Sequence, residues 1–166
     1  TYLFDMGNYN DKMLGIAAGY MEYLGTSDMT PEQVKSEFFR MGCSFNVKPG
    51  SERTYVSISG LAENMPKAIA LFEKLMADAQ ANAPAYTNLV GDILKSRMDA
   101  KANQGTNFSQ LRQYVTWGPE IKKTIPSAEE LQTANPQELV ERIHNIFGYK
   151  HRILYYGPAT EKELIA

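Results

Sequence analysis

Inward-facing and polar residues alternate along two neighbouring stretches of the chain, and a turn sequence separates them. The inward positions are Cys43, Phe45 and Val47 in the first stretch and Thr54, Val56 and Ile58 in the second. Strict alternation is typical of a strand with one buried face. The intervening Pro49-Gly50-Ser51 favours a reversal of the chain. We therefore predict an antiparallel β-hairpin here.

Helical spacing of apolar residues recurs on both sides of this hairpin. The predicted helices begin near residues 11, 31, 65, 83, 106 and 136. Thr30-Pro31-Glu32-Gln33 reads as a capping box with proline at the first helical position. Gly148 is the candidate C-cap of the last helix. Only a short turn separates the helices that begin near residues 65 and 83, so a helical hairpin is expected there.

Two further strands are predicted near the ends of the chain, at Tyr2–Met6 and at His151–Tyr156. The order of strand, helices, hairpin, helices and strand indicates an α+β fold, with helices layered on one face of a mainly antiparallel sheet. Because the chain starts on an apolar strand without an initiating methionine, we expect Tyr2–Met6 to be an exposed sheet edge. On this interpretation residues 1–166 are a single domain cut from a longer protein, without its first strand or strands.

Composition narrows the class of protein. A chain of 166 residues with 43% hydrophobic and 22% charged residues is typical of one water-soluble globular domain. Its 17 basic and 19 acidic residues give a net charge of -2 and no basic stripe, which argues against nucleic acid as a partner. No apolar run approaches the ~20 residues of a membrane span. The compartment is not fixed by the sequence, and the periplasm or secretion would be the options in a bacterium.

Few side chains could carry metal or nucleophilic chemistry. The chain has two histidines, His144 and His151, and they are not at the helical spacing of a zinc pair. The single cysteine, Cys43, falls on the apolar side of its predicted strand, as a small buried residue does. We therefore predict no catalytic residue, no bound metal and no cofactor in this domain.

One segment resembles the hallmark of a known enzyme family. The run LGIAAGYMEYLGT, from Leu14 to Thr26, is similar to the segment of pitrilysin/insulinase-type (inverzincin) zinc peptidases that carries H-x-x-E-H and then a Gly-Thr pair. In that family both histidines hold zinc, and the glutamate is the general base for the attacking water. Here Glu22 keeps the glutamate position, whereas Gly19 and Tyr23 occupy the histidine positions.

The resemblance extends over most of the chain. It continues through residues 31–39, 42–47, 53–61, 89–97 and 153–158. It implies the metallopeptidase fold called LuxS/MPP-like. Nothing near Asp92 matches the family's third ligand, a glutamate, and Phe45 stands near the position of a tyrosine that steadies the transition state. The resemblance therefore implies a non-catalytic unit, with zinc held in the catalytic unit of the parent chain.

In this family, four such units in one chain close around an unfolded peptide. The resemblance implies that this domain is an inactive structural part of the peptide-binding chamber, with the catalytic unit of the same parent and an unfolded peptide as its partners. It identifies no substrate-binding residue. Two alternatives stay open: a free-standing peptide-binding or assembly module with the same fold and no protease partner, and a metalloenzyme with an atypical ligand set.

Overall fold

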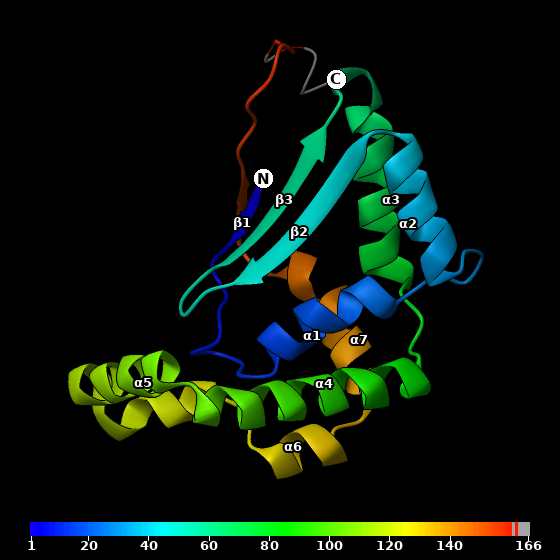
Figure 1. Ribbon diagram of the computed structural model, residues 1–166. Helices are drawn as coiled ribbons and strands as arrows, with labels where there is room; N and C mark the ends of the chain where they lie inside the picture. The colour runs from blue at the N-terminus through cyan, green and yellow to red at the C-terminus, as the bar shows by residue number, and fades with distance from the viewer. Residues whose placement is uncertain (161, 163–166) are drawn as a thin grey trace.

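A computed structural model describes residues 1–160 and 162. Within them, one antiparallel sheet has the strand order β2-β3-β1-β4 (Figure 1). The strands are β1 (Tyr2–Phe4), β2 (Cys43–Pro49), β3 (Thr54–Gly60) and β4 (His151–Ile153). Phe45 lies opposite Ile58, and Val47 lies opposite Val56. The predicted hairpin is confirmed, and so is the α+β class.

Helical segments make up most of the remaining chain. The α-helices are α1 (Leu14–Tyr20), α2 (Pro31–Arg40), α3 (Met65–Asp78), α4 (Ala83–Ala102), α5 (Gln104–Trp117), α6 (Ala128–Thr133) and α7 (Pro136–His144). The 3-10 turns are η1 (Met21–Tyr23), η2 (Ala62–Asn64), η3 (Gly118–Thr124) and η4 (Ile146–Gly148). The capping box at the start of α2 is confirmed: the Gln33 amide donates to the Thr30 hydroxyl, and the Gln33 side chain accepts from the Thr30 amide at 2.8 Å.

The helices do not form a single layer. Helices α2 and α3 cover one face of the sheet, whereas α1 and α7 pack together near its lower end (Figure 1). Helix α4 runs below them and leads into α5, which stands away from the body. The core between these elements includes the fully buried Phe4, Tyr20, Phe72 and Leu139. Cys43 is also buried, at 7% exposure, as the sequence predicted.

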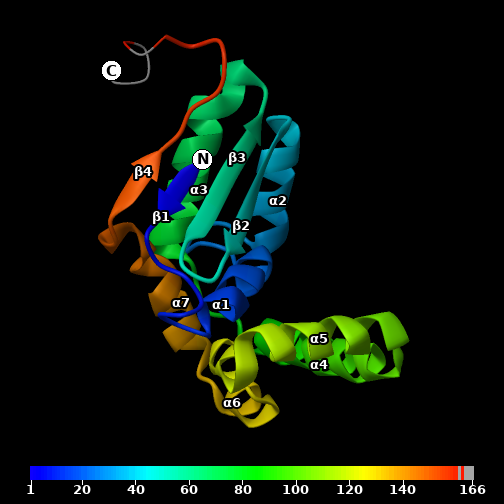
Figure 2. The same cartoon turned by 90° about the vertical axis from the view of Figure 1, so that its left-hand side faces the viewer.

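In the part of the chain that the structure describes, no helix covers the other face of the sheet (Figure 2). The strand registers place Lys48, Tyr55, Leu3 and Arg152 in one row across all four strands. Side chains alternate between the two faces of a strand, so this row points away from the buried Phe4 and Val56. We call this surface the open face.

The structure corrects the expectation that the first strand is a sheet edge. β1 lies inside the sheet, between β3 and β4, and Tyr2 pairs with both Val56 and Ile153. Thr1 is also tied to Leu154, because its ammonium group donates to the Leu154 carbonyl at 2.8 Å. The actual edges are β2 and β4.

Two helical predictions were also wrong. Helix α3 pairs with the sheet and with α7, whereas α4 packs against α5, α6 and α1, so the helical hairpin is α4–α5 and not α3–α4. Helix α7 ends at His144 with Asn145 as its C-cap, and Gly148 instead belongs to η4. In the part of the chain that the structure describes, no helix is both long enough and apolar enough to cross a membrane.

Candidate functional site

The segment that resembles the zinc motif does not lie on one continuous α-helix. Gly19 is in α1, which ends at Tyr20, whereas Glu22 and Tyr23 lie in the 3-10 turn η1. A 3-10 turn places residues three apart, not four apart, on the same side. Positions 19 and 23 therefore lack the geometry with which an α-helix aligns a pair of metal ligands.

The side chains at the three motif positions are not organised as a catalytic group. Gly19 is exposed, and a Cβ built on it would meet no atom within 4 Å. Tyr23 is 37% exposed, and the Lys35 ammonium lies 5.6 Å from the centre of its ring. Such a cation–π contact stabilises by about 0.5–1 kcal/mol at an exposed site. Tyr23 thus contributes to holding η1 beside α2.

The other candidate residues are scattered. Asp92 is exposed on α4, and His144 Nε2 contacts the Ala79 carbonyl oxygen at 3.2 Å. The His151 ring lies among aromatic rings, tilted against that of Phe4 with the two ring centres 5.1 Å apart. Among residues 1–160 and 162, the structure brings together no group of three or more His, Cys, Asp or Glu side chains that could hold a metal ion.

The Gly25-Thr26 pair that follows the motif has a structural role. Gly25 approaches the backbone so closely that a Cβ there would lie 2.2 Å from the Met29 carbonyl oxygen. Thr26 is buried at 7% exposure and its hydroxyl donates to Asp28 at 2.7 Å. This loop leads from η1 to the capping box of α2.

Two carboxyl groups fasten this loop to α3. Asp78 accepts hydrogen bonds from the amide and the hydroxyl of Ser27, at 2.9 and 2.5 Å. Lys74 donates to Asp28 at 2.6 Å. The bonds from Ser27 lower the pKa of Asp78, and the bond from Lys74 lowers the pKa of Asp28. Both groups are therefore held in their charged form.

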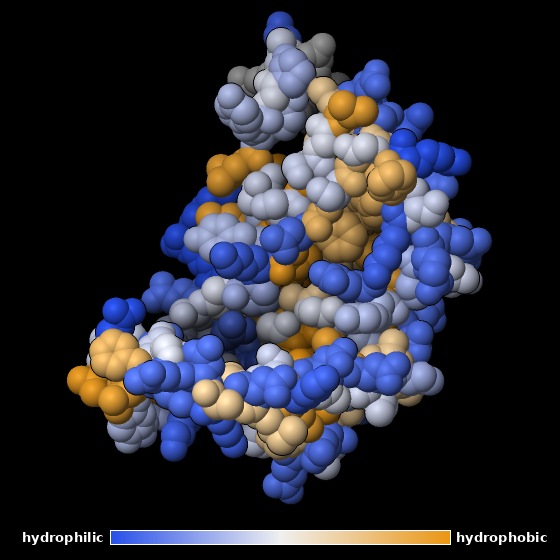
Figure 3. Space-filling model, viewed as in Figure 1, coloured by the Kyte–Doolittle hydropathy of each residue, from blue (hydrophilic) through white to orange (hydrophobic). Residues whose placement is uncertain are grey.

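Two hollows lie beside these elements. One, of about 280 Å³, lies between η1, α2 and the start of β2, and its apolar lining includes Val34, Phe38 and Phe45. Figure 3 shows apolar side chains in this region of the surface. The other, of about 650 Å³, separates the lower end of the sheet from α5 and η3, with Tyr9 on one side and Trp117 on the other.

The sequence alone did not reveal the open face, the second hollow or the exposure of α5. The open face and the hollow depend on strand order and on contacts between distant segments, which one sequence does not encode in its local pattern. The many aromatic residues of 106–117 were the available signal for α5, but they predicted a helix without showing that it would be exposed.

The comparisons with known proteins concern the fold. The sequence matches no protein-family model and no curated protein. Among solved structures, the periplasmic protease PqqL from Escherichia coli superposes with a TM-score of 0.78 at 12% identity, over 99% of this chain and 19% of that chain. This chain therefore spans about a fifth of the length of PqqL.

Two further structures agree. The ferredoxin protease FusC, in complex with Arabidopsis ferredoxin, gives a TM-score of 0.71 at 11% identity, over 90% of this chain and 17% of that chain. An inactive domain of a peptidase M16 from Pseudomonas fluorescens gives 0.70 at 14% identity, over 86% of this chain and 36% of that chain. The fold expected from the resemblance is confirmed: this chain has the fold of a unit of the M16 peptidases, a fold that an inactive M16 domain shares.

Proposed function

We propose that this chain is a non-catalytic unit of a larger M16-type zinc peptidase, and that its open face forms part of a wall around an unfolded peptide. The observation that carries the proposal is the uncovered sheet face, because it presents a surface of four strands to which another segment can bind (Figure 2). An antiparallel sheet can leave one such face in water until it is contacted. The interrupted motif helix supports the non-catalytic part of the proposal.

The chemistry of the open face suits contact with a peptide backbone. Besides Lys48, Tyr55 and Arg152, its polar positions include Thr1, Ser44, Asn46, Ser57 and Ser59. The hydroxyls form two weak pairs, Ser44 with Ser59 at 3.3 Å and Thr1 with Ser57 at 3.5 Å. Hydroxyl and amide groups both donate and accept, so they can bond to peptide groups of any sequence. Such contacts are weak and do not depend on the peptide sequence, which suits a surface that must release its substrate.

Zinc would be supplied by the catalytic unit of the same longer chain. The described residues of this unit gather no ligand set of their own. PqqL is described as periplasmic, and we propose the same compartment for this chain.

Site-specific photocrosslinking tests the proposal. The photoreactive residue p-benzoylphenylalanine replaces Tyr55, which is 44% exposed in the central row of the open face. The same residue at Glu141, exposed on α7, is the control. Reduced and carboxymethylated α-lactalbumin serves as the unfolded polypeptide.

We expect crosslinks from position 55 and few from position 141, with no cleavage of the polypeptide by this chain alone. Equal crosslinking from both positions, or none from position 55, would contradict the proposal that the open face contacts an unfolded peptide. Cleavage by the isolated chain would contradict the non-catalytic assignment.

A further inference from the structure

Helix α5 is a 14-residue helix without a single buried side chain. Only Thr106 and Ser109 are even partly buried. Helices of this length are marginal in water unless one side packs against the rest of the protein. Residues of low helix propensity, including Gly105 and Val115, weaken α5 further. Contacts beyond those within this chain would therefore stabilise it.

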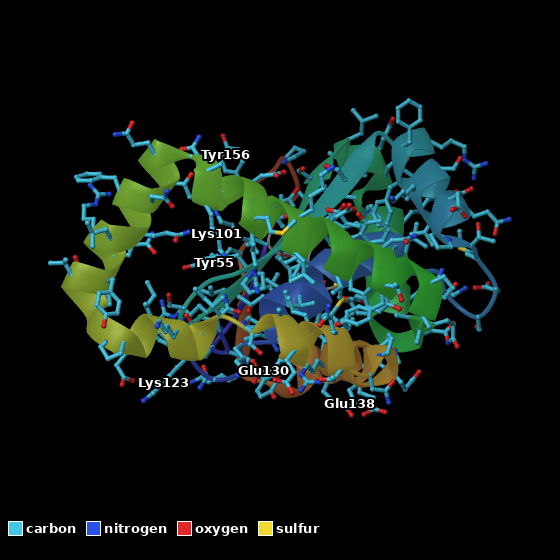
Figure 4. The ribbon with its side chains drawn as sticks, turned by 60° about the horizontal axis from the view of Figure 1, so that its bottom comes forward. Tyr55, Lys101, Lys123, Glu130, Glu138 and Tyr156 are labelled. Atoms are coloured by element: carbon cyan, nitrogen blue, oxygen red, sulfur yellow. The ribbon has the colours of Figure 1, made fainter. Side chains whose placement is uncertain are left out.

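The exposed side chains of α5 form an apolar stripe. Phe108, Leu111 and Val115 are 67%, 59% and 76% exposed. Their spacing of three and four residues places them on one side of the helix, and the partly buried Thr106 and Ser109 lie on the other side. A shallow hollow lined by residues that include Phe108 and Leu111 follows the stripe. Figure 3 shows apolar surface at the free end of the α4–α5 hairpin, and Figure 4 shows α5 standing clear of the body.

The chain segment that carries the stripe is basic. Residues 97–123 contain five cations and two carboxylates, which gives +3 in a chain of net charge -2. The cations are Arg97, Lys101, Arg112, Lys122 and Lys123, and the carboxylates are Asp99 and Glu120. Lys123 pairs with Glu120, and Arg97 donates to the Pro126 carbonyl. Within residues 1–160 and 162, Lys101, Arg112 and Lys122 form no ion pair.

We propose that the stripe of α5 is a docking surface for an acidic amphipathic helix on another folded unit. Aromatic residues, Met and Arg are enriched at protein interfaces, and the α4–α5 hairpin combines Phe108 with Arg112 and the 65%-exposed Met98. A partner helix lying along the stripe would complete a three-helix bundle with α4 and α5. Carboxylates flanking its apolar side would meet Arg112. The proposal does not depend on the function proposed above.

A second copy of this chain fits the same surface less well. Arg112 lies next to the middle of the stripe, because Leu111 is its central residue. Antiparallel pairing of two α5 helices centred on Leu111 would bring the two Arg112 residues to the same side of the seam. Like charges at such close range are destabilising, whereas an acidic partner neutralises the same residue.

The test uses two fluorescein-labelled helical peptides of about 18 residues with the same leucine stripe. Glutamates flank the stripe in one peptide and lysines flank it in the other. Fluorescence anisotropy follows the titration of each peptide with this chain at physiological salt. We expect saturable binding of the acidic peptide, at least about 10-fold tighter than that of the basic peptide.

Three variants locate the site. The double substitution Leu111→Asp with Val115→Asp should weaken binding of the acidic peptide at least about 10-fold, and Arg112→Glu should do so by a similar factor. Phe39→Asp, which changes an 88%-exposed aromatic residue on α2, is the matched control and should leave binding unchanged. Circular dichroism of each variant confirms that the fold is retained.

Three outcomes would overturn the proposal. The first is that neither peptide binds, and the second is that both bind equally, which would indicate unspecific apolar contact. The third is self-association of this chain, measured by sedimentation and abolished by the double substitution, which would identify a second copy as the occupant.

Discussion

Gly19 and Gly25 both belong to the segment that resembles the zinc motif, but their surroundings differ. A Cβ at Gly25 would lie 2.2 Å from the Met29 carbonyl oxygen, and the backbone of Thr30 and Pro31 is also close. A Cβ at Gly19 would meet nothing within 4 Å. The first glycine is therefore required by a close approach of two backbone segments, and the second is not.

Substitution of these two glycines by alanine should have opposite effects on stability. Gly25→Ala should lower the free energy of unfolding by about 1–3 kcal/mol, because the rigid backbone must move to admit the methyl group. Gly19→Ala should raise it by up to about 1 kcal/mol, because alanine is a better helix former than glycine. Urea unfolding followed by circular dichroism measures both, and equal effects would show that the Gly25 approach is not essential.

Restoring histidines at the motif positions should not create a zinc site. The double substitution Gly19→His with Tyr23→His supplies two imidazoles, but η1 interrupts the helix between them, so they are not held at the spacing of a metal-ligand pair. We expect both the unsubstituted chain and the variant to retain far less than one zinc per chain after dialysis, as measured by elemental analysis. About one tightly held zinc per chain in either protein would contradict this prediction.

The loop between η1 and α2 is fastened to α3 by charged hydrogen bonds. The pKa values of Asp28 and Asp78 lie below their ordinary value of 3.8 in the folded chain. The folded state therefore binds protons less readily than the unfolded state. The resulting contribution to stability is complete above the ordinary pKa, and it is lost as the pH falls through the lowered values.

The unfolding free energy should accordingly fall as the pH drops below about 4. The double substitution Asp28→Asn with Asp78→Asn should make this fall shallower, because the two groups can no longer take up protons. Asp92→Asn, at an exposed carboxylate on α4, is the control and should leave the slope unchanged. Urea unfolding between pH 6 and pH 2.5 provides the comparison. If the unfolding free energy of the double variant fell with pH as steeply as that of the unsubstituted chain, Asp28 and Asp78 would not be the cause of the fall.

Elements with a strong local signal were predictable from the sequence. The capping box at Thr30 and the alternation from Cys43 to Ile58 determined α2 and the hairpin, because both patterns depend on near neighbours. The end of α1 at Tyr20 was not predictable, since Met21 and Leu24 keep the helical spacing of apolar residues while the backbone tightens into η1.

At the candidate site, the sequence identified the positions Gly19, Glu22 and Tyr23 but not their geometry. The contact of Lys35 with Tyr23 joins two elements and has no signature in either. Likewise, the three-residue strand β4 pairs with β1. The position of β1 inside the sheet therefore depends on contacts between residues almost a full chain length apart. Long-range pairing of this kind is set by tertiary contacts and not by local pattern.

At the scale of the whole molecule, β4 joins the two ends of the chain. The Asp5 amide donates to the Lys150 carbonyl, and the Leu154 amide donates to the Thr1 carbonyl. The His151 ring also packs against Phe4 and Phe147. Among residues 1–160 and 162, this short strand is what covers the free side of β1.

Removal of β4 should therefore expose the edge that the sequence led us to expect. A chain truncated after Tyr149 should unfold several degrees lower than the full chain, at about 2–4 °C for each kcal/mol lost. It should also self-associate, because β1 then offers unpaired N–H and C=O groups. Truncation after Gly157, which keeps β4, is the control. Thermal unfolding and sedimentation test both effects, and a monomeric short form of unchanged stability would contradict them.

The exposure of Trp117 has a practical consequence for any study of this protein. It is the only tryptophan in the chain, and it is 61% exposed at the end of α5. Its indole is already hydrated in the native state, so its emission will change little when the core melts. The buried tyrosines Tyr2, Tyr20 and Tyr86 report on the core instead, and the rings of the last two are 5.5 Å apart. Intrinsic tryptophan fluorescence will therefore report on the surroundings of α5 and will change little on global unfolding.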